Sequence, residues 1–290
     1  MSSFLLYDSI IREEGDPKFT ISNNLNYQLL SISFEKILLF IKDNNLSNFD
    51  DNFDKEKIIK NFQSSLLEAY RNNLFNIGGI PEKNFLSLFF IFSILKPSLY
   101  VEVGFFKGCS LFCAYSSNSI KKIIAFDPNH ENLKYKFPPE CDIELNQIDF
   151  SEYNFQNLEK SSSLIFFDDH INTAKRIIES KDKGFKNLIF DDSHGLMGTC
   201  ERFYPAMPSL FFISNIKKFS IGDHFSWSMP IEKNKFSQLT FKFTEEIYEL
   251  CLKANSFIDK IYKIPDLNDY IFTPRKSKVI DNSQYFVKLI

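Results

Sequence analysis

The chain has 290 residues, of which 44% are hydrophobic and 24% charged, and its formal net charge is −3. This length can bury a substantial core without a disulfide or metal scaffold, and the balance of charge lacks the basic footprint of a nucleic-acid partner, so a small-molecule partner is expected. The cysteines are 5 in number and form no Cys-x-x-Cys pair. They therefore predict neither a zinc knuckle nor a disulfide framework and favour a cytoplasmic location.

The first 96 residues predict an N-terminal helical extension. Apolar residues recur at helical spacing from 27 to 95, with polar breaks at 44–54 and 78–81, which indicates three helices. The most apolar run, 85–95, is about half the length that crosses a bilayer, and no signal-peptide pattern opens the chain. We therefore expect a buried helix and no membrane partner. The extension has two candidate roles, as a lid or as the surface of a homo-oligomer.

From Pro97 onward the pattern changes to short apolar runs, each typical of a buried parallel strand. A helix is predicted over 171–183, closed by Gly184. Alternating strands and helices predict an α/β class: a Rossmann-like, doubly wound, mostly parallel sheet over residues 97–290, with ligands at the carboxyl ends of its strands. The five predicted strands are 99–103, 122–126, 143–148, 164–167 and 187–190.

After His194 this alternation stops. Residues 195–240 mix prolines, glycines and aromatic side chains, which predicts a lid or substrate-side insertion after the fifth strand. Within it, 223–227 offers aromatic faces for an acceptor, and a packed turn is the alternative. A helix over 244–261 and a final strand over 284–290 are also predicted.

The first strand ends in a glycine-containing turn, Glu102-x-Gly104-x-x-x-Gly108-x-Ser110. Glycines permit a tight turn and close approach to a ligand, and a carboxylate there can accept hydrogen bonds from a ligand ammonium or hydroxyl group. The alternative is a plain turn between strand and helix. The candidate cofactor-binding residues of this turn are Glu102, Gly104, Phe105, Lys107, Gly108 and Ser110.

The next two strands also end in acids. Asp127 follows the turn by about 20 residues, where Rossmann-like domains place the acid that accepts ribose hydroxyls. Asp127 before Pro128 is equally typical of an Asx turn. Asp149, after the third strand, is a candidate to meet an adenine amino group, through its side chain or the adjacent backbone.

Residues 99–194 resemble class I S-adenosylmethionine-dependent methyltransferases. The resemblance implies that Glu102, Gly104 and Gly108 hold the methionine part of the cofactor, that Asp127 holds the ribose, and that Asp149 lies near the adenine. A dinucleotide-dependent oxidoreductase would instead need glycine where Phe106 stands, because its pyrophosphate requires close approach to the backbone. S-adenosylmethionine has no phosphate and makes no such demand.

Two aspartate pairs follow the fourth and fifth strands, as Asp168-Asp169-His170 and Asp191-Asp192-Ser193-His194. Neighbouring strand ends lie close in a parallel sheet, and carboxylates brought together recruit a hard cation such as Mg²⁺. The alternative is that one aspartate of each pair caps a helix or turn. The predicted metal ligands are Asp168, Asp169, Asp191 and Asp192, and the predicted catalytic residues are His170, Asp169 and His194, a histidine acting as general base.

This pattern is similar to that of some sugar and macrolide O-methyltransferases, in which such aspartates hold a divalent metal that positions a diol. The resemblance implies transfer of a methyl group to a hydroxyl of a small metabolite such as a sugar or glycoside. Two alternatives stay open. One is a methyltransferase-like binding module without catalysis, and the other is a nucleotide-dependent oxidoreductase on the same fold.

Overall fold

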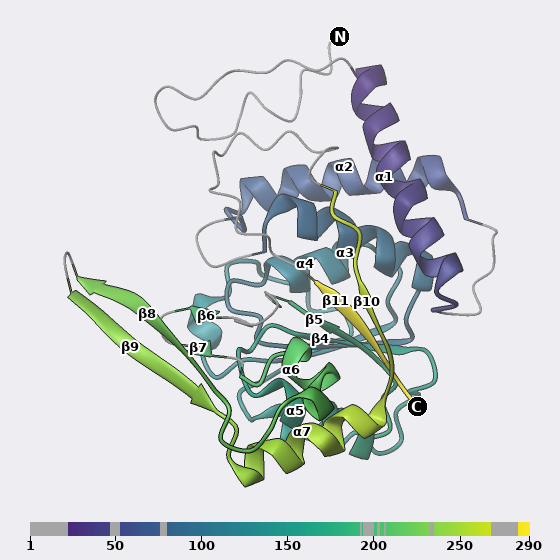
Figure 1. Ribbon diagram of the computed structural model, residues 1–290. Helices are drawn as coiled ribbons and strands as arrows, with labels where there is room; N and C mark the ends of the chain where they lie inside the picture. Colours follow the sequence, from purple (N-terminus) through teal and green to yellow (C-terminus); the bar gives the residue numbers. More distant parts are fainter. Residues whose placement is uncertain are drawn as a thin grey trace.

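The computed structural model describes residues 23–46, 53–75, 80–191, 193, 200–201, 204–205, 207–232, 235–267 and 284–290. Its centre is a 7-stranded sheet with helices on both faces (Figure 1). The strand order is β10-β11-β5-β4-β1-β2-β3. The strands of this sheet are β1 (Leu99–Val103), β2 (Lys122–Phe126), β3 (Ile143–Asn146), β4 (Ser163–Phe167), β5 (Asn187–Phe190), β10 (Ile258–Lys263) and β11 (Tyr285–Leu289).

The topology of the sheet confirms the Rossmann-like, mostly parallel α/β fold. Strands β1 to β5 are parallel, and their order reverses between β1 and β4, which is the switch point where doubly wound sheets bind ligands. Strand β11 is antiparallel to both β5 and β10. A dinucleotide-binding sheet of order 3-2-1-4-5-6 has a sixth strand in the place that the antiparallel β11 takes here.

Helices cover the two faces of the sheet in separate groups (Figure 1). The group that contains the predicted N-terminal extension shares one hydrophobic core with the sheet, so these helices form a layer of the fold. On that face lie α1 (Asn23–Asp43), α2 (Lys55–Arg71), α3 (Glu82–Leu95) and α4 (Cys109–Ser116); on the other lie α5 (Thr173–Asp182), α6 (Leu210–Ser214) and α7 (Glu245–Phe257).

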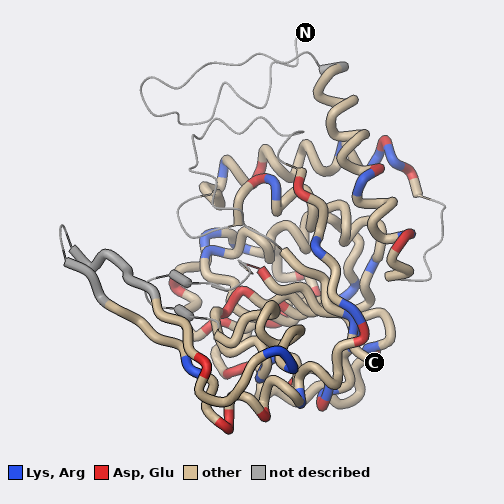
Figure 2. The backbone as a smooth tube through the Cα atoms, in the orientation of Figure 1, with Lys and Arg blue, Asp and Glu red and all other residues tan. Residues whose placement is uncertain are grey.

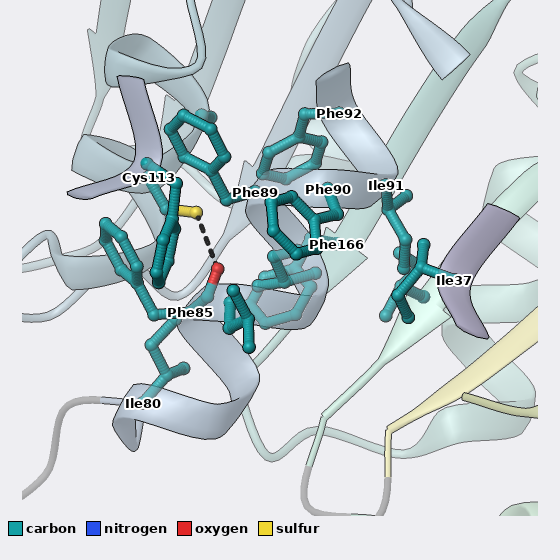
Figure 3. Packing of buried hydrophobic residues seen from close by; sticks show 14 of the residues in the cluster. Ile37, Ile80, Phe85, Phe89, Phe90, Ile91, Phe92, Cys113 and Phe166 are labelled. Atoms are coloured by element: carbon teal, nitrogen blue, oxygen red, sulfur yellow. Dashed lines mark hydrogen bonds between the residues drawn. The ribbon is translucent and has the colours of Figure 1, made fainter. Parts of the chain in front are cut away.

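Helix α3 is the predicted buried helix, and its side chains are buried from Glu82 to Ile94. Its phenylalanines fill the space between α1, α2, α4 and the sheet (Figure 3). Phe89, for example, meets the ring of Phe62 edge-on at a centroid distance of 5.5 Å. Burying each such ring contributes about 1.5–3 kcal/mol, which explains why so apolar a helix packs at the centre of a layer. Among the helices that the structure describes, none has the length and apolarity to cross a membrane.

Several predicted boundaries shift for local reasons. Helix α5 begins at Thr173 because the side chain of Asn172 accepts the N–H of Lys175 as an N-cap. The helix predicted over 244–261 is wrong at its end: α7 stops at Phe257, and Ile258 begins β10, which pairs with β11. Strand β3 ends at Asn146, two residues earlier than predicted.

The predicted insertion contains a long two-stranded hairpin, β8 (His224–Glu232) and β9 (Lys235–Lys242), which projects from the body of the molecule (Figure 1). It also contains a short antiparallel pair, β6 (Cys200–Glu201) and β7 (Tyr204–Pro205). Residues 194–199 lie outside the described part of the chain. The role of this insertion as a lid stays a prediction.

Candidate functional site

Acidic residues gather at the edge of the sheet where the parallel strands end (Figure 2). The glycine turn lies at the same edge. Gly104 has φ +86°, and a Cβ atom there would lie 2.5 Å from the backbone oxygen of Asp168 and 2.8 Å from Cα of Asp169. Only glycine therefore allows the end of β1 to approach the end of β4 this closely. Gly108, with φ +80°, is the N-cap of α4.

Glu102 lies beneath this turn and is 0% exposed. Its carboxylate accepts hydrogen bonds from Ser110 Oγ at 2.6 Å and from the Tyr100 hydroxyl at 2.9 Å. Burial raises the pKa of Glu102 to about 8, although both hydrogen bonds act to lower it. Glu102 and Ser110 thus hold the turn in shape from inside the protein. The contact of Glu102 with a ligand stays a prediction.

Asp127 joins the turn to the end of β2. One of its carboxylate oxygens accepts the N–H of Phe106 at 2.8 Å, and the other accepts the N–H of Asn129, also at 2.8 Å. The second bond is the Asx turn that the sequence predicts, and the first places the same carboxylate at the glycine turn. Each oxygen retains a second lone pair for a ligand hydroxyl. The prediction that Asp127 binds a ribose is therefore compatible with its turn.

The side chains between Gly104 and Gly108 differ in how far they are exposed to solvent. Phe105 is buried and packs on the ring of His130 at a centroid distance of 5.2 Å. Phe106 has φ +42° and its side chain is exposed. The ammonium of Lys107 lies 5.0 Å from the centroid of the Phe106 ring. A bulky side chain thus occupies the position that a pyrophosphate-binding turn reserves for glycine.

Asp149 and Asp169 are held by a residue that the sequence did not single out, Arg176 of α5. The guanidinium of Arg176 is 1% exposed and donates to both oxygens of Asp149 at 3.0 and 2.7 Å. It also donates to Asp169 at 2.7 Å and to Glu179 at 2.7 Å. Arg176 shares a helix face with Thr173 and Ser180, which are buried but polar, so the apolar periodicity of α5 does not mark it as buried.

These ion pairs affect the pKa values of two acids, Asp149 and Asp169. Hydrogen bonds from Arg176 hold the pKa of Asp149 well below its usual range, whereas burial raises the pKa of Asp169 against the opposing effect of Arg176. The carboxylates of Asp149 and Asp169 both face the guanidinium of Arg176. The role of Asp149 near an adenine, and the roles of Asp169 as a metal ligand and as a catalytic group, stay predictions.

His170 and Asp168 lie directly after β4. His170 has φ +55°, and its Nε2 atom lies 3.4 Å from Oδ1 of Asp168. Both side chains are partly exposed. An imidazole held beside a carboxylate is the usual arrangement of a general base with an orienting group.

At the end of β5, Asp191 accepts a hydrogen bond from the side chain of Asn84 at 3.2 Å. Asp192 and His194 lie outside the described residues. Within the part of the chain that is described, no three His, Cys, Asp or Glu side chains are arranged to hold a metal ion. Asp169 is paired to Arg176, and the predicted Mg²⁺ site, which includes Asp192, stays a prediction.

No family model matches the chain, and no curated protein matches it. Three solved structures resemble it weakly. A methyltransferase of Podospora anserina, PaMTH1, bound to S-adenosylhomocysteine, is 11% identical with a TM-score of 0.42, over 94% of this chain and 99% of that one. An O-methyltransferase of Bacillus cereus in complex with S-adenosylhomocysteine is 11% identical with a TM-score of 0.38, over 62% and 89%. A methyltransferase of Geobacter sulfurreducens is 13% identical with a TM-score of 0.34, over 64% and 90%.

Likenesses this weak carry no conclusion about family or activity. The strand order and the turn after β1 nonetheless define the class of protein: a Rossmann-like α/β protein. Proteins of this fold bind ligands at the carboxyl ends of the parallel strands.

Proposed function

We propose that this protein is an S-adenosylmethionine-dependent methyltransferase that methylates a hydroxyl group of a small polar metabolite, such as a sugar or glycoside. The observation that carries the proposal is the turn 104–108 at the switch point, with Asp127 bonded to the N–H of Phe106 at 2.8 Å. It combines close backbone approach, a carboxylate for ribose hydroxyls and a bulky Phe106 side chain. This combination suits a nucleoside without a pyrophosphate.

The proposed reaction is a displacement at the methyl carbon of the cofactor. A lone pair of the acceptor oxygen forms the new C–O bond while the C–S bond breaks, and its electron pair stays on sulfur to give S-adenosylhomocysteine. The acceptor hydroxyl releases one proton. Catalysis of this type comes mostly from holding oxygen, carbon and sulfur in line.

His170 is the proposed acceptor of that proton. It lies directly after β4, beside the switch point, and Asp168 at 3.4 Å from Nε2 orients its ring and stabilises the imidazolium that forms. Nδ1 is then the nitrogen that takes the proton, and because this atom is buried, the bound acceptor has to reach it inside the site. No step is assigned to a metal ion, because the described acids do not form a metal site.

Calorimetric titration tests the cofactor. We expect S-adenosylmethionine and S-adenosylhomocysteine to bind and NAD not to bind. Asp127→Asn should weaken binding by about tenfold or more, since it removes a charged hydrogen-bond acceptor. Asp223→Asn is the matched control, because Asp223 accepts a backbone N–H at 2.8 Å in a turn within the insertion. Binding of NAD without S-adenosylmethionine would overturn the proposal.

Mass spectrometry of a panel of hydroxylated acceptors tests the reaction. Transfer to a hydroxyl adds one methylene mass to the acceptor and yields one S-adenosylhomocysteine. Cofactor binding without turnover on any acceptor would favour the non-catalytic binding module instead.

A further inference from the structure

The start of helix α3 lies at the same sheet edge as the glycine turn. The thiol of Cys109, the first residue of α4, lies 3.8 Å from the carbonyl oxygen of Ile80. On the other side, the side chain of Asn84 donates to Asp191 at the end of β5. The first turn of α3 therefore spans the sheet edge from the turn after β1 to the end of β5.

Lys83 in this first turn is largely buried, and the described residues offer it no ion-pair partner. It is 9% exposed, and no carboxylate of the described residues lies within ion-pair distance of its ammonium. Its neighbour Glu82 accepts a hydrogen bond from the Tyr70 hydroxyl at 2.8 Å. A lysine buried to this extent is usually paired with an acid.

The helix end adds further donors. Pro81 is the N-cap of α3 and has no side-chain cap bond, and its carbonyl accepts the N–H groups of Asn84 and Phe85. The N–H groups of Glu82 and Lys83 have no acceptor among the described residues. A helix N-terminus carries partial positive charge, so an anion bound at this end of α3 would be stabilised by it.

Gln284 supplies an independent sign of a ligand. It is 4% exposed, and its Nε2 atom is buried with no hydrogen-bond partner in the described structure. It directly precedes β11, in which Tyr285 pairs with Phe190, so the antiparallel register puts Gln284 opposite Asp191. Asp191 in turn accepts from Asn84 of α3. A buried amide without a partner is rare in native proteins and calls for an acceptor.

We propose that Lys83, the N-terminus of α3 and Gln284 bind a carboxylate of the methyl acceptor, which is therefore a hydroxy acid. All three contribute donors, and a carboxylate presents several lone pairs to them. Asn84 and Gln284 lie at β5 and β11, on the far side of β4 from Asp127 and the ribose side of the crevice. This position favours the acceptor over the methionine carboxylate. The inference rests on the proposed methyltransferase function.

The test uses the full chain saturated with S-adenosylhomocysteine and a set of small hydroxy acids, glucuronate among them, each paired with its neutral amide. Thermal shift and calorimetry report binding. At least one acid should bind about tenfold more tightly than its amide, and Lys83→Met should remove the preference. Gln284→Leu should weaken the same acid and serves as a second variant where Lys83→Met does not fold. Lys60→Met, an exposed lysine on α2, is the control.

Three results would overturn the inference. One is equal binding of every acid and amide, a second is a preference that survives both variants, and a third is a loss of S-adenosylhomocysteine affinity in Lys83→Met, which would assign the lysine to the cofactor. Sugar phosphates included in the set would reveal a preference for phosphate over carboxylate. S-adenosylhomocysteine binding by the wild type is measured in the same samples. Its absence would contradict the proposed function, whereas its presence without an acid preference contradicts only this inference.

Discussion

Two buried polar clusters lie at the same edge of the sheet, and they differ in whether their charges are satisfied. The first, the Arg176 cluster, consists of Arg176 with Asp149, Asp169 and Glu179, and all three acids are bonded to the guanidinium at 2.7–3.0 Å. The second, the α3 cluster, consists of Lys83, Asn84, Asp191 and Gln284. In it Asn84 donates to Asp191, whereas the described residues offer no ion-pair partner to Lys83 and no acceptor to the buried amide of Gln284.

The difference separates structure from function within one set of acids. A buried network in which every member is bonded makes its surroundings rigid, and one with donors left over is stable only if something else supplies the acceptors. The Arg176 cluster ties the ends of β3 and β4 to α5. The α3 cluster lies where we propose that the acceptor binds, and a bound carboxylate would supply acceptors for its donors.

The largest effect is expected from breaking the Arg176 cluster. Arg176→Met leaves its carboxylates unpaired in a buried setting, which should reduce the free energy of unfolding by about 3–5 kcal/mol near neutral pH. Asp149 is 33% exposed, so its share of this loss is screened by water. Urea unfolding measures the loss. Lys175→Met, which removes a largely exposed neighbour on the same helix, should change stability by less than about 1 kcal/mol.

The same variant has a predictable pH dependence. In the wild type Arg176 holds the pKa of Asp149 below its unfolded value, so this acid stabilises the fold above its unfolded pKa and loses that contribution as the pH falls through the folded pKa. Without Arg176 the acids take up protons more readily on acidification. The deficit of Arg176→Met should therefore shrink as the pH falls. A deficit independent of pH would show that lost packing, not charge, causes it.

A smaller effect is expected from Gly104→Ala, which disturbs the contact between β1 and β4 that holds both clusters at one edge. The new Cβ atom would lie 2.5 Å from the backbone oxygen of Asp168, at φ +86°. We expect a loss of about 2–3 kcal/mol in stability and weaker binding of S-adenosylhomocysteine. Gly222→Ala is a matched control, because it has φ +99° but no atom within 4 Å of the added Cβ, and it should cost only about 1 kcal/mol. Equal losses in the two variants would contradict the role of close approach.

The sequence predicts the sheet better than it predicts the partners of the acids. Strands β1, β2 and β5 match their predicted bounds, because each is a short apolar run between turn signals. The pairs Asp168-Asp169 and Asp191-Asp192 look equivalent in the sequence. Their difference depends on Arg176, which reaches Asp169 only through the packing of α5, and on Asn84, which is 107 residues from Asp191. Contacts of this range leave no periodic pattern, and Gln284 is likewise placed only by the register of β11.

The smallest effect at neutral pH is expected from Glu102→Gln, which tests whether burial keeps this acid protonated. Burial raises the pKa of Glu102 from 4.5 to about 8, so the folded protein retains a proton that the unfolded chain releases between these values. The folded state then binds more protons, and wild-type stability should fall as the pH rises across this window. Glutamine stays neutral and keeps the shape of the side chain, so the variant should remain within about 1 kcal/mol of the wild type near pH 7 and lose less stability toward alkaline pH.

Urea unfolding at several pH values measures the change of stability with pH in both proteins, with the exposed Glu140→Gln as control. Identical slopes in Glu102→Gln and the wild type would mean that Glu102 is ionised in its buried position and that the bonds from Ser110 and Tyr100 alone offset its desolvation.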